Sequence, residues 1–247
     1  MRLKLSIFIA KFAALVSKKF LGRSGETVAG RVLLALYPKA ISELAKGKKI
    51  ICVSGTNGKT STTKALVSII SKLGSVATSP SGSNLERGVA AALMAKSEFA
   101  VLEVDELHLS RVIEEAKPKA VLLLNLTRDQ LHRMHEVKRV ADRWAKSASA
   151  SPETLFVGDI DDPFVALALN SAAQSLKISF GGRKHQDGAV CPSCGKYLKW
   201  IRNNYKCACG LSNSNPDVIV ESGSAALGEF LPERVYFQLA QIGRAHV

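Results

Sequence analysis

Residues 50–74 read IICVSGTNGKTSTTKALVSIISKLG, and this stretch decides the class of fold. Its first four residues are apolar and mostly β-branched, which is typical of a buried parallel strand. Gly55, Asn57 and Gly58 then allow a tight turn whose backbone N–H groups can face a phosphate. The residues at 60–73 predict a helix whose positive end points at that phosphate. We therefore expect a strand, a phosphate-binding loop and a helix in direct succession.

Two side chains at the end of this loop suit a nucleotide and its metal ion. Lys59 supplies a positive charge for the β- and γ-phosphates, and the Thr60 hydroxyl can bind Mg²⁺. The spacing is Gly-x-x-Gly-Lys-Thr and not the full Walker pattern, since Val53 stands where the first glycine would be. The alternative is an ordinary glycine-rich turn between a strand and a helix. The residues expected to bind ATP are Gly55, Thr56, Asn57, Gly58, Lys59, Thr60 and Ser61.

The chain beyond the loop keeps alternating between short apolar runs and helical stretches. The runs expected to form strands lie at 76–79, 99–106, 120–130 (which ends in a polar loop) and 154–159. The helices are expected at 86–96, 107–116, 131–148 and 163–170. Such alternation predicts an α/β fold with a doubly wound, mainly parallel sheet that binds ligands at the carboxyl ends of its strands.

Several polar side chains stand at or just beyond the carboxyl ends of the expected strands: Glu103, Asp105, Glu106, Asn125 and Asp129. A carboxylate in this place can complete a Mg²⁺ shell beside ATP. The alternative for Asp105 and Glu106 is that they cap the helix that follows. Glu103 lies inside an apolar strand, where an unpaired carboxylate would be costly, so a metal ligand is the better interpretation.

Four of the five cysteines lie together in CPSCGKYLKWIRNNYKCACG, residues 191–210. Cys191 and Cys194 form one knuckle, and Cys207 and Cys209 form a second that is one residue shorter than usual. Four thiolates at this spacing predict a structural, tetrahedral Zn²⁺ in a ribbon inserted at 188–212. The segment between the knuckles predicts a hairpin that turns at Asn203-Asn204. A redox pair and an empty knuckle are the alternatives.

The basic charge of the chain is concentrated near its beginning. Residues 1–49 carry +9 of the net charge of +13. We expect residues 1–48 to form a helical arm, because the apolar residues of 2–21 recur at helical spacing between lysines. The arm either rests on anionic lipid headgroups or packs its apolar face on the domain. We expect no membrane span, since no apolar run reaches about 20 residues, and no nucleic-acid partner, since aromatic residues are few.

The segment SGTNGKTSTT (54–63) resembles the ATP loop of the Mur ligases. Further matching segments are GRVLLALYP (30–38), SGSNLERG (81–88), EVDE (103–106), NLTRDQLHR (125–133) and DDP (161–163). Together with the cysteine ribbon, they resemble the amidating type of Mur ligase, which works with a glutaminase subunit. The resemblance implies that residues 49–247 are a Mur ligase central ATP-binding domain.

The resemblance also implies a reaction. ATP would phosphorylate the α-carboxylate of D-glutamate in the lipid II stem peptide, and ammonia from a GatD-type glutaminase would convert the acyl phosphate to D-isoglutamine. A cytoplasmic protein, peripheral at the inner face of the membrane, is implied with it. The residues implied are Lys59, Glu103, Asn125 and Asp129 in catalysis, Thr60 and Glu103 at Mg²⁺, Asp162 at the nucleotide and Asn84 at the substrate.

The chain departs from this pattern in several places. His132 stands where the family has Asp, and Asp159 stands where Asn is usual. The ending QLAQIGRAHV (238–247) does not resemble the family, so we expect the C-terminal ligase domain to be absent and this fragment alone to be inactive. We expect Cys52 to be a buried residue, so ammonia must come from a partner. The rival functions are an amino-acid-adding ligase of the muramyl-peptide or folylpolyglutamate synthetase kind, and a basic zinc-ribbon module that binds nucleic acid.

Overall fold

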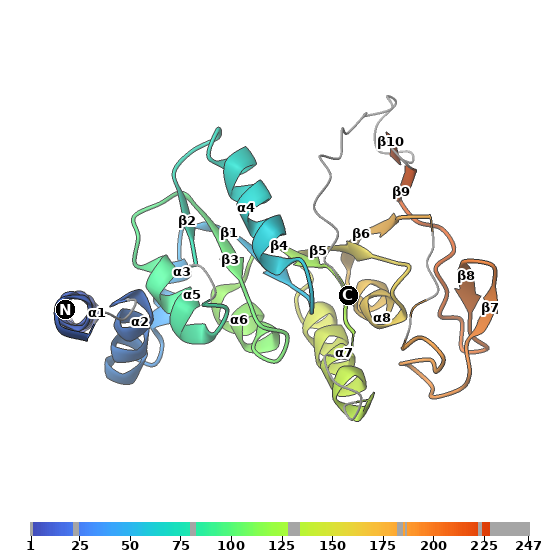
Figure 1. The fold of residues 1–247 in the computed structure, drawn as a ribbon, viewed down its shortest axis with the longest axis horizontal. Helices are drawn as coiled ribbons and strands as arrows, with labels where there is room; N and C mark the ends of the chain where they lie inside the picture. Colours follow the sequence, from blue (N-terminus) through green and yellow to red (C-terminus); the bar gives the residue numbers. More distant parts are fainter. Residues whose placement is uncertain are drawn as a thin grey trace.

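The computed structural model describes residues 2–21, 25–79, 83–127, 134–181, 185, 187–221 and 224–227 of the chain (Figure 1). The predicted α/β fold is confirmed. Its central sheet has the strand order β10-β9-β6-β5-β4-β1-β3-β2. All neighbouring strands in it run parallel except β9 and β10, which are antiparallel. The strands are β1 (Lys49–Ser54), β2 (Val76–Thr78), β3 (Phe99–Glu103), β4 (Ala120–Leu123), β5 (Leu155–Asp159), β6 (Gln174–Ser179), β9 (Val218–Glu221) and β10 (Ser224–Leu227).

Helices cover both faces of the sheet, as expected of a doubly wound fold. Figure 1 shows α4 on one side and α5, α6, α7 and α8 on the other. Their bounds are α4 (Lys59–Ile70), α5 (Glu86–Leu93), α6 (Leu109–Ala116), α7 (Met134–Ser149) and α8 (Pro163–Ser171). The strands expected at 99–106 and 120–130 are shorter than predicted, because the chain leaves the sheet after Glu103 and after Leu123.

The alternation of side chains along β1 divides the interior into two cores. Ile50 and Cys52 pack on the side of α5 to α8. Val53 packs on the side of α4, with Ile51 partly buried against the same cluster. Cys52 is fully buried as predicted, and burial raises the pKa of its thiol to about 12. A strand with both faces covered needs the nearly unbroken apolar run that the sequence shows.

The position of β1 places the functional loop. It pairs with β3 on one side and β4 on the other. The chain crosses from one side of β1 to the other between these two strands, which makes the carboxyl end of β1 a topological switch point. Doubly wound sheets bind their ligands in the crevice at such a point, and the loop at 55–58 begins there.

Three helices precede the sheet: α1 (Arg2–Leu21), α2 (Gly25–Leu36) and α3 (Ala40–Ala45). The second of them packs closely on α5, where a Cβ at Gly30 would lie 1.7 Å from the Arg87 carbonyl oxygen. Leu33 of α2 is fully buried in the main core. The first helix packs on α2 at one end of the molecule (Figure 1). Among the helices that the structure describes, none has the length and apolarity to cross a membrane.

The cysteine segment forms a separate small ribbon at the opposite end (Figure 1). Its hairpin consists of β7 (Lys199–Ile201) and β8 (Asn204–Lys206), with Ile201 paired to Asn204. The predicted turn at Asn203-Asn204 is therefore wrong by one residue: the chain turns at Arg202 and Asn203. Cross-strand aromatic packing fixes this register, because Trp200 faces Tyr205 with ring centroids 5.1 Å apart.

Candidate functional site

The loop after β1 approaches the end of β4 so closely that only glycine fits at its start. Gly55 has a φ of 142°, and a Cβ there would lie 2.9 Å from the Asn125 carbonyl oxygen. Gly58 has a φ of 86° and is the residue from which α4 begins. The first turn of a helix leaves its backbone N–H groups without partners inside the helix, so the loop before α4 has the donors of an anion site. The predicted strand, loop and helix are thus confirmed as elements.

The ammonium group of Lys59 lies inside the loop. It donates hydrogen bonds to the carbonyl oxygens of Gly55 and, at 3.1 Å, of Thr56. It also forms an ion pair with the Glu106 carboxylate at 3.4 Å. Glu106 was expected either to complete a Mg²⁺ shell at a strand end or to cap a helix, and its contact with Lys59 was not predicted. A phosphate held in the loop would compete with these oxygen atoms for the same positive charge.

Thr60 and Glu103, which the resemblance places together at Mg²⁺, are in contact in the structure. The Thr60 hydroxyl lies 2.9 Å and 3.2 Å from the two carboxylate oxygens of Glu103, a buried residue at the end of β3. Two adjacent ligands of an octahedral Mg²⁺, each at about 2.05 Å, would be about 2.9 Å apart. These residues therefore fit a magnesium ion that is also bound by phosphate oxygens. Ser61 lies next to them in the first turn of α4.

Asn125 braces the loop. Its side-chain amide accepts a hydrogen bond from the Asn57 N–H at 2.9 Å and donates one to the Asn57 carbonyl oxygen at 3.0 Å. Its own carbonyl oxygen accepts from the Thr56 N–H at 2.9 Å. Thr127, which the sequence reasoning missed, pairs with the Thr56 hydroxyl in the same way, at 3.0 Å and 3.2 Å. The only feature of the sequence that points to Thr127 is its position two residues beyond Asn125, after the same strand.

Asp162 links the end of β4 to α8. One of its carboxylate oxygens accepts from the Phe164 N–H at 2.8 Å and caps the helix, and the other accepts from the Leu126 N–H at 2.7 Å. The side chain is 2% exposed. Backbone donors thus engage both carboxylate oxygens, and a contact of Asp162 with a nucleotide stays a prediction.

Two titratable groups next to Asp162 have displaced pKa values. Burial lowers the pKa of His185, but the Asp162 carboxylate, 3.3 Å from its Nε2, and the charges of Asp187 and Asp159 together outweigh burial, so the pKa is raised above its usual value. Burial is also the main reason that the pKa of Asp159 rises to about 7, and the negative charges of Asp161 and Asp162 add to it. Three acidic side chains thus lie close together at the end of β5, and the repulsion between their negative charges favours the protonated form of Asp159.

The remaining predicted residues have less direct evidence. The Asn84 carbonyl oxygen accepts from the Asp105 N–H at 2.7 Å, which brings the segment before α5 to the end of β3. The Asp105 carboxylate accepts from the Leu107 N–H at 3.0 Å and closes the turn before α6. It does not cap the helix, contrary to its alternative interpretation, because α6 begins at Leu109 with His108 at its N-cap and no side-chain cap. Asp129 and His132 lie outside the residues that the structure describes.

The four cysteines of the ribbon come together as predicted. Their sulfur atoms all lie within 4.8 Å of one another. The separations are 3.6 Å between Cys191 and Cys209 and 3.4 Å between Cys194 and Cys207. A tetrahedral zinc ion with sulfur ligands at about 2.3 Å requires about 3.8 Å between them, whereas a disulfide requires about 2.05 Å. The backbone N–H of Leu211 lowers the pKa of Cys209 to about 6, whereas burial raises the pKa of Cys191 to about 12, so without a metal Cys209 favours the thiolate and Cys191 does not. The group fits a closed, structural metal site.

The ribbon is joined to the end of β5 by buried contacts. The Tyr205 hydroxyl donates to the Ile160 carbonyl oxygen at 2.9 Å, and the Asn213 side chain donates to the Asp161 carboxylate at 2.9 Å. Ile160 also belongs to the apolar cluster that contains Cys191. The ribbon is therefore packed against the segment that includes Asp162.

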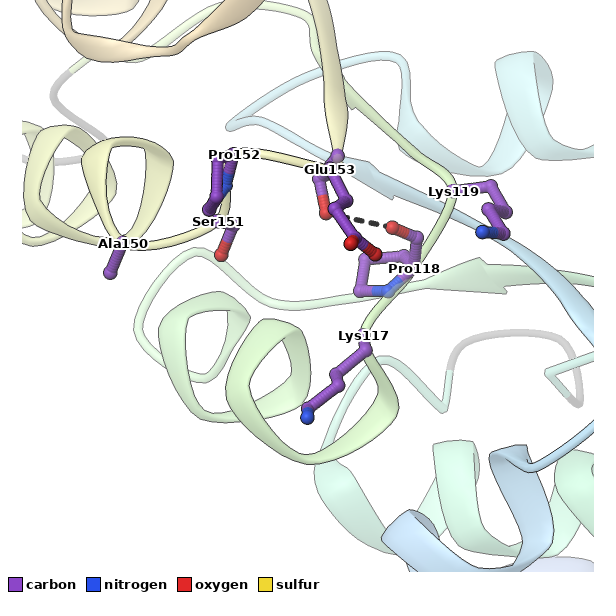
Figure 2. Close-up of a pocket in the computed structure, with 8 residues that line it drawn as sticks. Lys117, Pro118, Lys119, Ala150, Ser151, Pro152 and Glu153 are labelled. Carbon is purple, nitrogen blue, oxygen red and sulfur yellow. Dashed lines mark hydrogen bonds between the residues drawn. The ribbon is translucent and has the colours of Figure 1, made fainter.

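A pocket of about 210 Å³ lies at the opposite end of the strands, where β4 and β5 begin (Figure 2). It is lined by residues 117–119 and 150–154, which lead into β4 and β5. The Thr154 hydroxyl donates across it to the Pro118 carbonyl oxygen at 2.8 Å. Ligands of doubly wound sheets bind at the carboxyl ends of the strands, so this pocket is not part of the nucleotide site.

Comparison with known sequences agrees with this geometry. The Mur ligase middle domain matches residues 53–210. The chain is 33% identical over 204 residues to the lipid II isoglutaminyl synthase (glutamine-hydrolyzing) subunit MurT of Streptococcus pneumoniae, covering 75% of this chain and 44% of that protein. It is 28% identical over 248 residues to the Staphylococcus aureus subunit of the same name, covering 92% and 56%. The chain thus spans about half the length of these relatives.

Solved structures with the same fold are Mur-type ligases. A pseudomurein peptide ligase type C from Methanothermus fervidus superposes with a TM-score of 0.56 at 21% identity, covering 77% of this chain and 42% of that one. The MurF ligase from Thermotoga maritima, solved in complex with ADP, gives a TM-score of 0.52 at 19% identity, covering 72% and 41%. The chain belongs to the Mur ligase family and, within it, is similar to the MurT subunits.

Proposed function

We propose that this chain is the ATP-binding part of a MurT-type ligase that amidates the lipid II stem peptide. The observation that carries the proposal is the pairing of the Thr60 hydroxyl with the Glu103 carboxylate at 2.9 Å, directly beside the loop that holds Lys59. A hydroxyl, a buried carboxylate and an ammonium group at a helix N-terminus form the donor set that Mg·ATP needs. The similarity to MurT subunits supports the choice of reaction.

The proposed reaction activates a carboxylate. The α-carboxylate oxygen of D-glutamate attacks the γ-phosphorus of ATP, ADP leaves, and an acyl phosphate forms. The nitrogen of ammonia then attacks the acyl carbon and phosphate leaves. The loss of a proton gives the α-amide, so that D-glutamate has become D-isoglutamine. A free carboxylate is a poor acyl donor because its oxygen leaves badly, and phosphorylation removes that obstacle.

The residues of this chain position the reacting groups and offset the negative charge of the phosphates. Lys59 and the N–H groups at the start of α4 hold the β- and γ-phosphates, which gather negative charge in the transition state. Thr60 and Glu103 would hold Mg²⁺, which offsets that charge when bound. Asn125 keeps the loop in shape through Asn57, so we assign it a positioning role. Asn84 at the substrate and Asp129 in catalysis remain part of the proposal.

The ribbon would hold zinc in a purely structural role. All four ligands come from cysteines, so no position is open for a substrate. The glutaminase of the GatD type would supply ammonia as a separate subunit, in keeping with the name of the relatives as subunits. We place the protein in the cytoplasm at the inner face of the membrane, where it would meet lipid II.

Calorimetric titration with Mg·ATP tests the nucleotide site. We expect saturable binding that requires Mg²⁺, and a loss of about tenfold or more in affinity for Lys59→Ala, because a charged hydrogen-bond donor to phosphate is removed. Lys64→Ala is the matched control, since Lys64 is an exposed lysine one turn further along α4. The absence of Mg·ATP binding in folded protein, or equal affinities for the two variants, would refute the proposed site.

The nucleophile is tested separately in a chimera. The aligned segment of the Streptococcus pneumoniae MurT is replaced by that of this chain, and the protein is supplied with lipid II, Mg·ATP and either ammonium or free amino acids. Conversion of the carboxylate to its amide supports amidation. Attachment of an amino acid would instead identify an amino-acid-adding ligase of the Mur type.

A further inference from the structure

The first helix, α1, has apolar side chains on two opposite faces. One face carries small residues and packs towards α2: Ala10 is fully buried, and Ser6 and Ser17 are nearly so. Small side chains at this contact allow the two helices to approach closely. Leu3 and Ile7 extend the contact, partly buried against the main core. The domain therefore holds α1 in place through a face that leaves the exposed side chains of Phe8 and Phe12 out of the contact.

The opposite face of α1 carries two phenylalanines and two leucines that point to solvent. Leu5, Phe8, Phe12 and Leu15 are between 61% and 68% exposed. Their spacing of three and four residues puts them in one stripe along the helix. Ile9 and Val16 continue the stripe with about 40% exposure each. Large apolar side chains grouped in this way mark a contact surface, whereas single exposed ones do not.

A row of lysines borders this stripe. Lys4, Lys11 and Lys18 are exposed and recur every seven residues, so they lie along one side of the helix. Arg2 lies on the other side of the stripe. The sequence contains no Asp or Glu before Glu26. The surface thus joins apolar and positive groups with no negative charge among them.

We propose that α1 lies flat on an anionic phospholipid bilayer. The stripe of Leu5, Phe8, Phe12 and Leu15 would enter the boundary between headgroups and acyl chains, and the lysine row would bind headgroup phosphates. Contact through a second copy of the chain is disfavoured by charge, because two α1 helices packed stripe to stripe would bring basic rows together with no acidic partner on either helix. The inference rests on α1 alone, so its failure would leave the proposed nucleotide site untouched.

Co-sedimentation of the full chain with vesicles tests the proposal. One set of vesicles contains phosphatidylcholine only, and the other contains phosphatidylcholine and phosphatidylglycerol. We expect binding to the anionic vesicles, weakened by salt, and much less binding to the neutral ones. Phe8→Ser/Phe12→Ser should lower the affinity about tenfold or more, since two aromatic side chains no longer enter the bilayer. Ile69→Ser/Leu73→Ser is the matched control, because it removes two exposed apolar residues elsewhere and should leave binding unchanged.

A second measurement keeps α1 otherwise intact. The chain contains Trp144 and Trp200, so a Phe12→Trp variant is compared with the unsubstituted chain. Its added tryptophan fluorescence should shift to the blue with anionic vesicles, and brominated lipid should quench it. Equal vesicle binding by the two double-serine variants, or an unshifted Phe12→Trp spectrum, would overturn the proposal. So would a concentration-dependent dimer that Phe8→Ser/Phe12→Ser abolishes in sedimentation velocity, because the stripe would then be a contact between two copies.

Discussion

Replacement of Asp162 by alanine should destabilise the protein by about 3 kcal/mol. The change removes the cap of α8, which typically contributes about 1 kcal/mol. It also leaves the Leu126 N–H, which Asp162 binds at 2.7 Å in a buried position, without its acceptor. An unsatisfied buried donor costs about 1–3 kcal/mol. The two contributions concern different backbone groups, so we expect them to add approximately.

Urea unfolding at pH 7, followed by far-UV circular dichroism, measures this change. A loss of about 3 kcal/mol should also lower the melting temperature by about 6–12 °C in a chain of this size. Asp142→Ala is the control, because its carboxylate makes an exposed ion pair with Lys138 on α7, and its loss should cost at most about 0.5 kcal/mol. Similar unfolding midpoints for the two variants would refute the reasoning that Asp162 carries two buried hydrogen bonds.

Three further changes test other parts of the structure. Asp159→Asn should make the protein about 2 kcal/mol more stable at pH 8 and change little at pH 4. The raised pKa of about 7 keeps Asp159 protonated in the native state between pH 4 and 7, while the same carboxyl ionises in the unfolded state, so stability falls as the pH rises through this range; urea unfolding across it checks this, and an unchanged pH profile would contradict it. Gly55→Ala should abolish Mg·ATP binding, since its Cβ would lie 2.9 Å from the Asn125 carbonyl oxygen; retained affinity in calorimetry would be inconsistent with the tight loop. Cys194→Ser should lower the zinc content of purified protein well below one ion per chain, measured by atomic emission, while Cys52→Ser should not, because buried Cys52 lies on β1 outside the cluster.

The fold was predictable because its signals are local. The strand at 49–54 and the helix from Lys59 each carry their own periodicity, and the glycines between them specify the turn. The position of Glu103 beside the phosphate loop was also predictable, because carboxyl ends of parallel strands lie at the same end of the sheet and a carboxylate in an apolar strand needs a partner; that this partner is the Thr60 hydroxyl was not predicted.

The contacts that brace the site could not be predicted in this way. The hydrogen bonds between Asn57 and Asn125, and between Thr56 and Thr127, join residues about 70 positions apart. Asn and Thr are common in loops, and nothing in their local sequence shows which of them will meet. The hairpin turn was misplaced for a related reason. Its register is fixed by the packing of Trp200 on Tyr205, and the Asn-Asn pair was a weaker signal.

The attachment of the ribbon to β5 gives the proposed metal site and the proposed nucleotide site a series of buried hydrogen bonds in common. Buried hydrogen bonds run from Asn213 in the ribbon to Asp161, and from the adjacent Asp162 to the Leu126 N–H, next to the residue that braces the phosphate loop. If nucleotide changes the affinity of the thiols for a metal, the metal must change the affinity for nucleotide by the same factor. The affinity of the ribbon for zinc, measured by competition with a chelator, would then report the occupancy of the loop at the far end of the molecule.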